Sequence, residues 1–166
     1  MPATDEARRQ QLALVLLRVT LGLILLATWR ENLHNGLYTA EGLRGFFVNG
    51  VFAPAGIDGG PAWYRSLVEA TVLVQPGLFA SFQMVAELLL GLALLLGAFT
   101  RPAAVAAGFF FANLLLAYWG GTEWIWTYVL LVVSALAVAL STTGRLLGLD
   151  GLLYRRFGTP RWPFLW

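Results

Sequence analysis

The sequence predicts an all-α integral membrane protein: a four-helix bundle with two short interfacial helices in a long first outer loop. Hydrophobic residues make up 58% of the 166 positions, and charged residues make up only 12%. The mean hydropathy of +0.71 is far more apolar than a typical soluble domain allows. The apolar residues also gather in long runs, each close to the roughly 20 residues that an α-helix needs to cross a bilayer.

Four apolar segments are the expected transmembrane helices: residues 12–33, 78–99, 103–119 and 124–140. The first is longer than a signal-peptide core, contains Arg18 and is not followed by a small-residue cleavage site, so we expect it to be retained. With the outer loop 34–77, the four helices form one domain over residues 1–153. An arginine-rich and aromatic tail follows at 154–166.

The arginines predict the orientation in the membrane. The predicted outer loops contain Arg44 and Arg65, whereas the termini and the turn at 100–102 contain Arg8, Arg9, Arg101, Arg145, Arg155, Arg156 and Arg161. Basic residues are enriched in cytoplasmic loops. We therefore expect a multi-pass protein of the plasma or inner membrane, with both its N- and C-termini in the cytoplasm.

The outer loop is long and aromatic, and it should fold on the membrane surface. Thr39 can cap a short helix that Asn49 and Gly50 would end. A second helix is expected to begin at Pro61 and to stop before Pro76. Both helices should lie in the outer interface and form a roof over the bundle.

The composition excludes several kinds of chemistry. The chain has no cysteine, so it cannot form disulfides or thiolate-held clusters, and any thiol chemistry must come from a partner. A single histidine cannot supply two axial ligands to haem. No metal-ligand cluster, nucleotide-binding loop or nucleophile elbow is present, and no basic stripe suggests nucleic-acid binding. We expect no metal site and no nucleic-acid partner.

Two charged residues lie inside predicted spans, where an ionisable side chain is costly. Arg18 lies in the first span and Glu87 near the centre of the second. We hypothesise that they form a buried, hydrogen-bonded pair between the first two helices. Such a pair either clamps the helices in register, which is the more common role, or lines a cavity where it contacts a quinone or relays a proton.

Three further polar residues complete the candidate site. Gln83 and Asn113 could donate neutral hydrogen bonds to a carbonyl ligand, although such side chains more often bond between helices. His34, just beyond the first span, could exchange a quinone-linked proton, or it could simply cap the helix end. Arg18, Glu87, Asn113, Gln83 and His34 are therefore the candidate site residues, and no catalytic residue is assigned.

The chain resembles the DoxX-like membrane family, which includes DoxD, the small subunit of thiosulfate:quinone oxidoreductase. Three stretches carry the resemblance: L-L-R-V-T-L-G-L-I-L-L at 16–26, E-L-L-L-G-L-A-L-L-L-G-A-F-T-R-P-A-A at 87–104, and G-R-L-L-G-L-D at 144–150. The likeness extends to about Leu153. It implies a four-helix bundle that acts as the membrane subunit of an oxidoreductase assembly and passes electrons to quinone.

Three functions remain open. The leading hypothesis is a quinone-interacting or accessory subunit of a membrane redox complex, without a covalent cofactor or a reaction of its own. The second is a structural subunit that stabilises a larger respiratory or photosynthetic assembly, and the third is a small transporter. The expected partners are the lipid bilayer and either other redox subunits or further copies of the chain.

Overall fold

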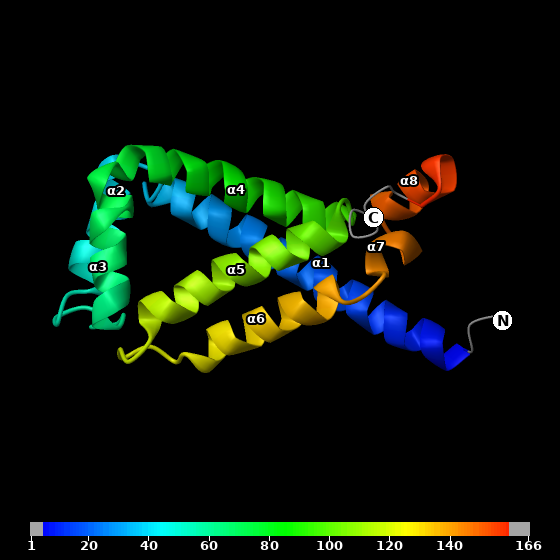
Figure 1. The fold of residues 1–166 in the computed structure, drawn as a ribbon, viewed down its shortest axis with the longest axis horizontal. Helices are drawn as coiled ribbons and strands as arrows, with labels where there is room; N and C mark the ends of the chain where they lie inside the picture. The colour runs from blue at the N-terminus through cyan, green and yellow to red at the C-terminus, as the bar shows by residue number, and fades with distance from the viewer. Residues whose placement is uncertain (1–4, 160–166) are drawn as a thin grey trace.

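The computed structural model describes residues 5–159, and this part of the chain contains helices and no strands. Long helices run along the molecule, and short helices lie at both of its ends (Figure 1). In chain order the elements are α1 (Asp5–His34), α2 (Ala40–Gly45), the π-helix η1 (Phe46–Val51), α3 (Ala62–Ala70), the 3₁₀-helix η2 (Val72–Val74), α4 (Pro76–Leu96), α5 (Thr100–Tyr118), α6 (Trp126–Ala139), α7 (Thr143–Leu146) and α8 (Leu149–Phe157). The last part of the predicted tail, 160–166, lies outside the described residues.

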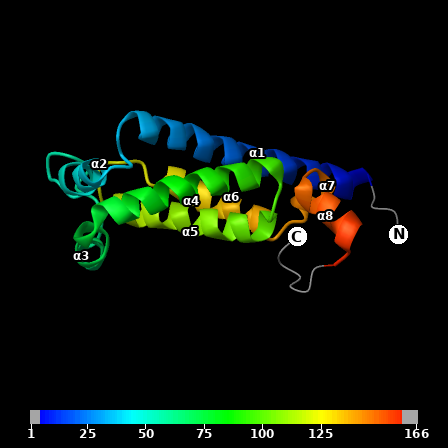
Figure 2. The same ribbon diagram turned by 90° about the horizontal axis from the view of Figure 1, so that it is seen from above.

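Helix α1 packs closely along α4, in the opposite direction (Figure 2). A Cβ atom at Gly22 would meet the backbone of Leu95 and Gly91, and one at Gly91 would meet the side chain of Leu26. Near the C-terminal end of α1, Trp29 Nε1 donates a hydrogen bond to the backbone oxygen of Met84 at 3.0 Å. The two glycines therefore permit the close approach that fixes the register of α1 against α4.

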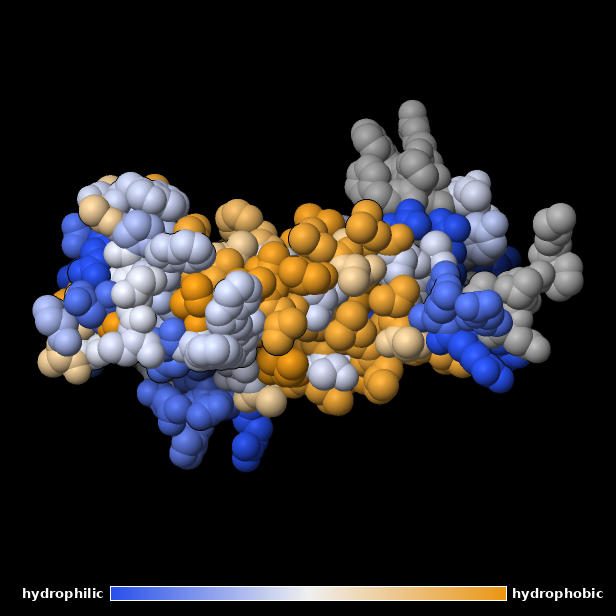
Figure 3. All heavy atoms as spheres, turned by 90° about the horizontal axis from the view of Figure 1, so that it is seen from below, coloured by the Kyte–Doolittle hydropathy of each residue, from blue (hydrophilic) through white to orange (hydrophobic). Residues whose placement is uncertain are grey.

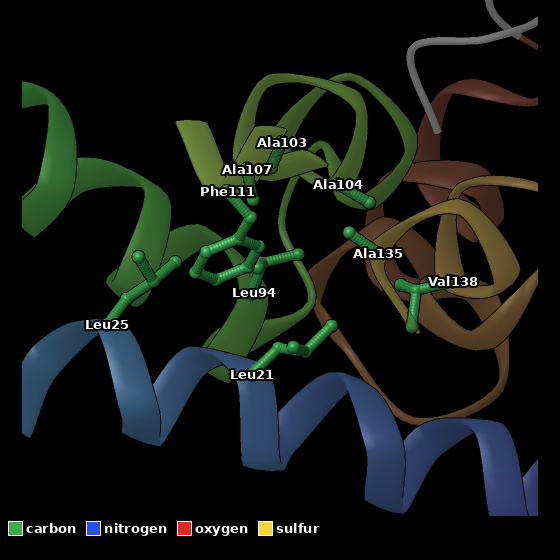
Figure 4. Close-up of a cluster of buried hydrophobic side chains, with 9 residues drawn as sticks. All are labelled: Leu21, Leu25, Leu94, Ala103, Ala104, Ala107, Phe111, Ala135 and Val138. Atoms are coloured by element: carbon green, nitrogen blue, oxygen red, sulfur yellow. The ribbon is translucent and has the colours of Figure 1, made fainter. Parts of the chain in front are cut away.

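Helix α5 packs mainly against α6, and the main hydrophobic core lies between this pair and the pair α1–α4. Figure 4 shows that side chains from all four helices meet there, with small residues on α5 facing α6. The buried members are Leu21, Leu25, Leu94, Ala103, Ala104, Ala107, Phe111, Ala135 and Val138. Close packing of small side chains suits helices in lipid, where van der Waals contact rather than water drives association.

Three helices are long and apolar enough to cross a membrane: Arg8–His34 within α1, α4 and α5. Helix α6 is also apolar, but its 14 residues fall short of the roughly 20 that a perpendicular span needs. On the face that Figure 3 shows, hydrophobic residues cover the middle of the molecule and hydrophilic residues gather toward both ends. The all-helical membrane architecture is therefore confirmed, with three long apolar helices and one shorter one.

Residues 35–75, here called the roof, cover one end of the bundle (Figure 1). The predicted cap is confirmed, because Thr39 Oγ1 accepts a hydrogen bond from the backbone N–H of Gly42 at 3.0 Å. The roof packs onto the tops of α4 and α5 through a second buried cluster: Leu43, Phe47, Val51, Tyr64, Val68, Leu73, Ala80 and Ala117. The roof is thus a packed part of the domain.

One predicted boundary in the roof is wrong and another is confirmed. Asn49 and Gly50 do not end the first helix, because the π-helix η1 continues through them, and the Phe52 N–H bonds the Phe47 carbonyl at 2.8 Å. Helix α3 follows Pro61 and stops before Pro76, as predicted; it ends at Ala70 because the backbone of Thr71 leaves the helical region.

Candidate functional site

A groove runs along the bundle between α4 and α5, which separate as they leave their shared turn (Figure 1). It encloses about 1370 Å³, and its walls are apolar apart from Gln83, Arg101 and Asn113. Roof residues close its far end, and the exposed Phe82, Leu89, Val105 and Phe109 line its open side. The full lining is Leu43, Phe47, Val72, Phe79, Phe82, Gln83, Val85, Ala86, Leu89, Leu90, Arg101, Pro102, Val105, Ala106, Phe109, Phe110, Asn113, Ala139 and Leu140. A lipophilic molecule could enter this groove sideways.

Gln83 and Asn113 place one amide on each helix that borders the groove. On the α5 side, the hydroxyl of Tyr64 donates to Asn113 Oδ1 at 3.1 Å, which leaves the Nδ2 amide free to donate to a ligand. Tyr64 is only 2% exposed, and this burial raises the pKa of Tyr64 to about 12. Its hydroxyl therefore keeps its proton at physiological pH and holds the Asn113 amide in one orientation.

Glu87, with an exposed fraction of 0%, lies one helical turn after Gln83 on α4. The hydroxyl of Tyr38 donates to Glu87 Oε2 at 2.7 Å, and Asn32 Nδ2 lies 3.5 Å from both carboxyl oxygens. The side chain of Gln83 lies close enough to this carboxyl group to interact with it. The predicted residues Glu87 and Gln83 therefore lie together, and both belong to a polar network that connects the groove with the roof.

Tyr38 belongs to the roof, outside the membrane helices, and it is half-buried. Burial, together with its hydrogen bond to Glu87, raises the pKa of Tyr38 well above its ordinary value. The hydroxyl therefore remains a proton donor toward the carboxyl group. Asn32 Nδ2 also lies 3.5 Å from the Tyr38 hydroxyl, so α1 and the roof hold Glu87 jointly.

The hypothesis of an Arg18–Glu87 pair is wrong. Because α1 and α4 are antiparallel, Asn32 is the residue of α1 that reaches Glu87, while Arg18 lies beside Gly97 just beyond α4. Arg18 and Asn32 are 14 residues apart, which corresponds to about 21 Å along a helix. That distance is far beyond the reach of an arginine side chain. Depth counted inward from the predicted helix ends does not give the register of α1 against α4, and it is this register that places Asn32 beside Glu87.

Arg18 instead joins a buried cluster at the α7–α8 end. Its Nη2 donates to the carbonyl of Leu147 at 2.6 Å, and the guanidinium passes so close to Gly97 and Gly148 that a Cβ atom at either position would collide with Nη1. The Asp150 carboxylate accepts hydrogen bonds from the backbone N–H groups of Phe99 and Thr100, at 2.6 and 2.9 Å. This cluster ties α1 to the α4–α5 turn and to α8, as a structural clamp would.

His34 lies apart from both networks. It is the last residue of α1, it is exposed, and its neighbours Arg30 and Glu31 on the same helix are exposed as well. Within the part of the chain that the structure describes, no group of three or more histidine, cysteine or acidic side chains is placed to hold a metal ion. The position of His34 at a helix end suits the capping alternative better than direct contact with the groove.

Sequence reasoning missed Tyr38, Tyr64 and Asp150 as partners. The tyrosines come from the roof, whose docking onto the bundle depends on tertiary contacts that no local pattern encodes. Asp150 did have a signal in the sequence, because it ends the G-R-L-L-G-L-D stretch. The glycines of this stretch make room for neighbouring side chains: a Cβ atom at Gly144 would strike Asp150 and Thr100.

Comparison with known proteins places this architecture in a family. A search of curated proteins and a search of solved structures each found no match. The DoxD family, described as the TQO (thiosulfate:quinone oxidoreductase) small subunit DoxD, matches residues 13–164. The match covers α4, α5 and α6 in full and α1 from residue 13, and it continues past Leu153, where the resemblance in the sequence was expected to end. The chain therefore belongs to the DoxD family of membrane redox-complex subunits.

Proposed function

We propose that this chain is the quinone-binding membrane subunit of a thiosulfate:quinone oxidoreductase complex, and that the quinone binds in the groove between α4 and α5. The observation that carries the proposal is a lipid-facing apolar groove with an amide on each wall, at Gln83 and Asn113. Family membership supplies the reaction, since the matched description names a subunit of an enzyme that reduces quinone.

The size and the polarity of the groove suit such a ligand. Its volume of about 1370 Å³ exceeds the roughly 300–1,000 Å³ typical of sites for drug-sized ligands. A prenylated quinone has a polar ring and a long apolar tail, so it needs a long site with few polar groups. Side entry from the bilayer would let the ligand exchange with the quinone dissolved in the membrane.

The two amides would hold the ring. A quinone carries two carbonyl oxygens, each of which accepts hydrogen bonds, and the Gln83 and Asn113 side chains each offer N–H donors. Tyr64 fixes the Asn113 amide, and Glu87 lies beside the Gln83 amide. The ring would therefore lie in the half of the groove nearest the roof.

Electrons must reach the groove from another subunit. The chain has no cysteine and one histidine, which are too few for an iron–sulfur cluster or a bis-histidine haem of its own. We therefore place thiosulfate oxidation on a partner subunit. Most arginines flank the α7–α8 end, so we assign that end to the cytoplasm and the roof to the outer face.

Replacing either amide should weaken quinone binding. We expect Gln83→Leu and Asn113→Leu each to raise the quinone Kd about three- to tenfold, because a neutral hydrogen bond contributes about 0.5–1.5 kcal/mol. The measurement is a titration of the purified complex in lipid nanodiscs with a short-tailed quinone. The matched control is Ser134→Ala, which removes a partly buried polar group from α6 outside the groove.

The same titration decides between the proposal and its main alternative. Unchanged quinone affinity in both amide variants would exclude the groove as the quinone site. If the variants then also retained normal complex assembly, a purely structural subunit would be the better assignment. Weakened binding in the amide variants but not in the Ser134→Ala control would support the proposed site.

A further inference from the structure

A series of neighbouring polar side chains links the groove to the roof. Gln83 lines the groove one helical turn from Glu87, and the Glu87 carboxyl group accepts a hydrogen bond from the Tyr38 hydroxyl at 2.7 Å. Tyr38 is half-buried in the roof, so it lies between the buried Glu87 and the outer surface of the protein. The nearby charged residues do not interrupt the route: Arg30, Glu31, His34 and Glu41 are exposed, and Arg44 donates to the carbonyl of Leu73.

The opposite direction offers no comparable route along the groove. Gln83 lies 7 residues from the start of α4, which corresponds to about 10 Å, and 13 residues from its end, or about 20 Å. Between Gln83 and Arg101 the α4 and α5 walls present only Val85, Ala86, Leu89, Leu90, Pro102, Val105, Ala106, Phe109 and Phe110, apart from Asn113 at the roof side. Apolar side chains neither donate nor accept protons, so the described lining offers no proton path between the ring site and the α7–α8 end.

We infer that protons for quinone reduction enter from the roof end, through Tyr38 and Glu87. This inference rests on the proposed function. Reduction of the ring to the quinol uses two electrons, which thiosulfate oxidation on the partner supplies, and two protons, and it converts two carbonyl groups to two hydroxyl groups. Glu87 gives up two protons in succession to the bound ring, one for each carbonyl oxygen. After each transfer Tyr38 passes a proton to Glu87 and takes one up from water at the roof.

The partners of Glu87 suit this role. Its described hydrogen-bond partners, Tyr38 and Asn32, and the neighbouring Gln83 are all uncharged, and no basic side chain lies within salt-bridge distance among the described residues. A carboxyl group buried beside neutral partners gains or loses a proton more readily than one locked to an arginine. A hydroxyl group can accept a proton on one side while it donates on the other, as a relay requires.

The first test compares Tyr38→Phe with Tyr154→Phe, a change on α8 at the opposite end. We expect Tyr38→Phe to lower the kcat of thiosulfate-dependent quinone reduction at least about tenfold, with the quinone Kd unchanged, while Tyr154→Phe changes neither. The infrared difference spectrum of reduction should contain a carboxyl band that Glu87→Gln removes. Normal kcat in Tyr38→Phe, or a carboxyl band that persists in Glu87→Gln, would overturn the route.

The second test needs no variant. The wild-type complex is reconstituted in vesicles with one pH dye inside and another outside, and protease access to a C-terminal tag gives the orientation. Thiosulfate added outside activates only those complexes whose donor site faces outward. The compartment that faces the roof should become alkaline as quinone is reduced. Proton uptake from the tag side would refute the inference, yet it would leave quinone binding at Gln83 and Asn113 intact.

Discussion

Asp150→Asn should strongly destabilise the protein, whereas Asp58→Asn should have almost no effect. Asp150 is 2% exposed, and its two carboxylate oxygens accept the backbone N–H groups of Phe99 and Thr100 at the start of α5. An asparagine offers only one acceptor oxygen, and its NH₂ group would face an N–H donor. The substitution also removes the negative charge closest to Arg18, whose electrostatic partner is Asp150.

The expected size follows from the loss of hydrogen bonds to a buried carboxylate. A hydrogen bond to a charged group contributes about 1.5–3 kcal/mol, and Asp150 accepts two, so the loss is about 3–5 kcal/mol. Arg18 is itself 2% exposed, and its Nε and Nη1 atoms have no hydrogen-bond partner among the described residues. The guanidinium therefore depends on Asp150 and on the carbonyl of Leu147. For a chain of this size the loss corresponds to a fall in melting temperature of about 10 °C.

Asp58 is the matched control because it makes an exposed ion pair. Its Oδ1 lies 3.0 Å from Arg65 Nη2, and the side chains are 31% (Arg65) and 56% (Asp58) exposed. Pairs of this kind contribute about 0–1 kcal/mol. Asparagine also tolerates the left-handed backbone of Asp58, where φ is 52°. The measurement is loss of the monodisperse detergent-solubilised protein on heating, and equal melting temperatures for the two variants would disprove the role assigned to Asp150.

Prediction from sequence succeeded for the features that a bilayer requires of any helix that crosses it. Apolar runs located α1, α4 and α5 to within a few residues at most ends, because a membrane helix must be both long and apolar. The start of α1 is the exception: the helix begins at Asp5, seven residues before the predicted boundary at 12, since polar residues can extend a helix into water. The Thr39 cap was also predictable, because a cap is a local contact between a side chain and the next turn.

The partners of the charged residues were not predictable in the same way. Buried charge correctly marked Arg18 and Glu87 as unusual, and both are buried. Their partners, however, depend on the register of α1 against α4 and on the docking of the roof. A shift of a few residues in either helix changes which side chains face each other, and apolar runs do not specify that shift. The contacts of Tyr38 and Asp150 therefore emerged only from the folded arrangement, although the G-R-L-L-G-L-D stretch marked the region of Asp150.

Filling the groove should block a long-tailed quinone more than a tailless one. Ala106 is exposed on the α5 wall of the groove, 7 residues before Asn113 and thus about 10 Å further along the helix. If the amides hold the ring, the tail passes Ala106. We expect Ala106→Trp to raise the Kd of a prenylated quinone at least about tenfold, since each buried CH₂ group contributes about 0.8 kcal/mol and displacing two suffices.

A tailless benzoquinone needs only the ring site, so its Kd should change by less than about threefold in the same variant. Ala27→Trp is the matched control, because Ala27 is also exposed but lies on α1 outside the groove, and it should leave both affinities unchanged. Equal loss for both quinones in Ala106→Trp would mean that the ring, not the tail, lies at Ala106. That result would show that Gln83 and Asn113 do not contact the ring, and it would remove the basis for a proton route through Glu87.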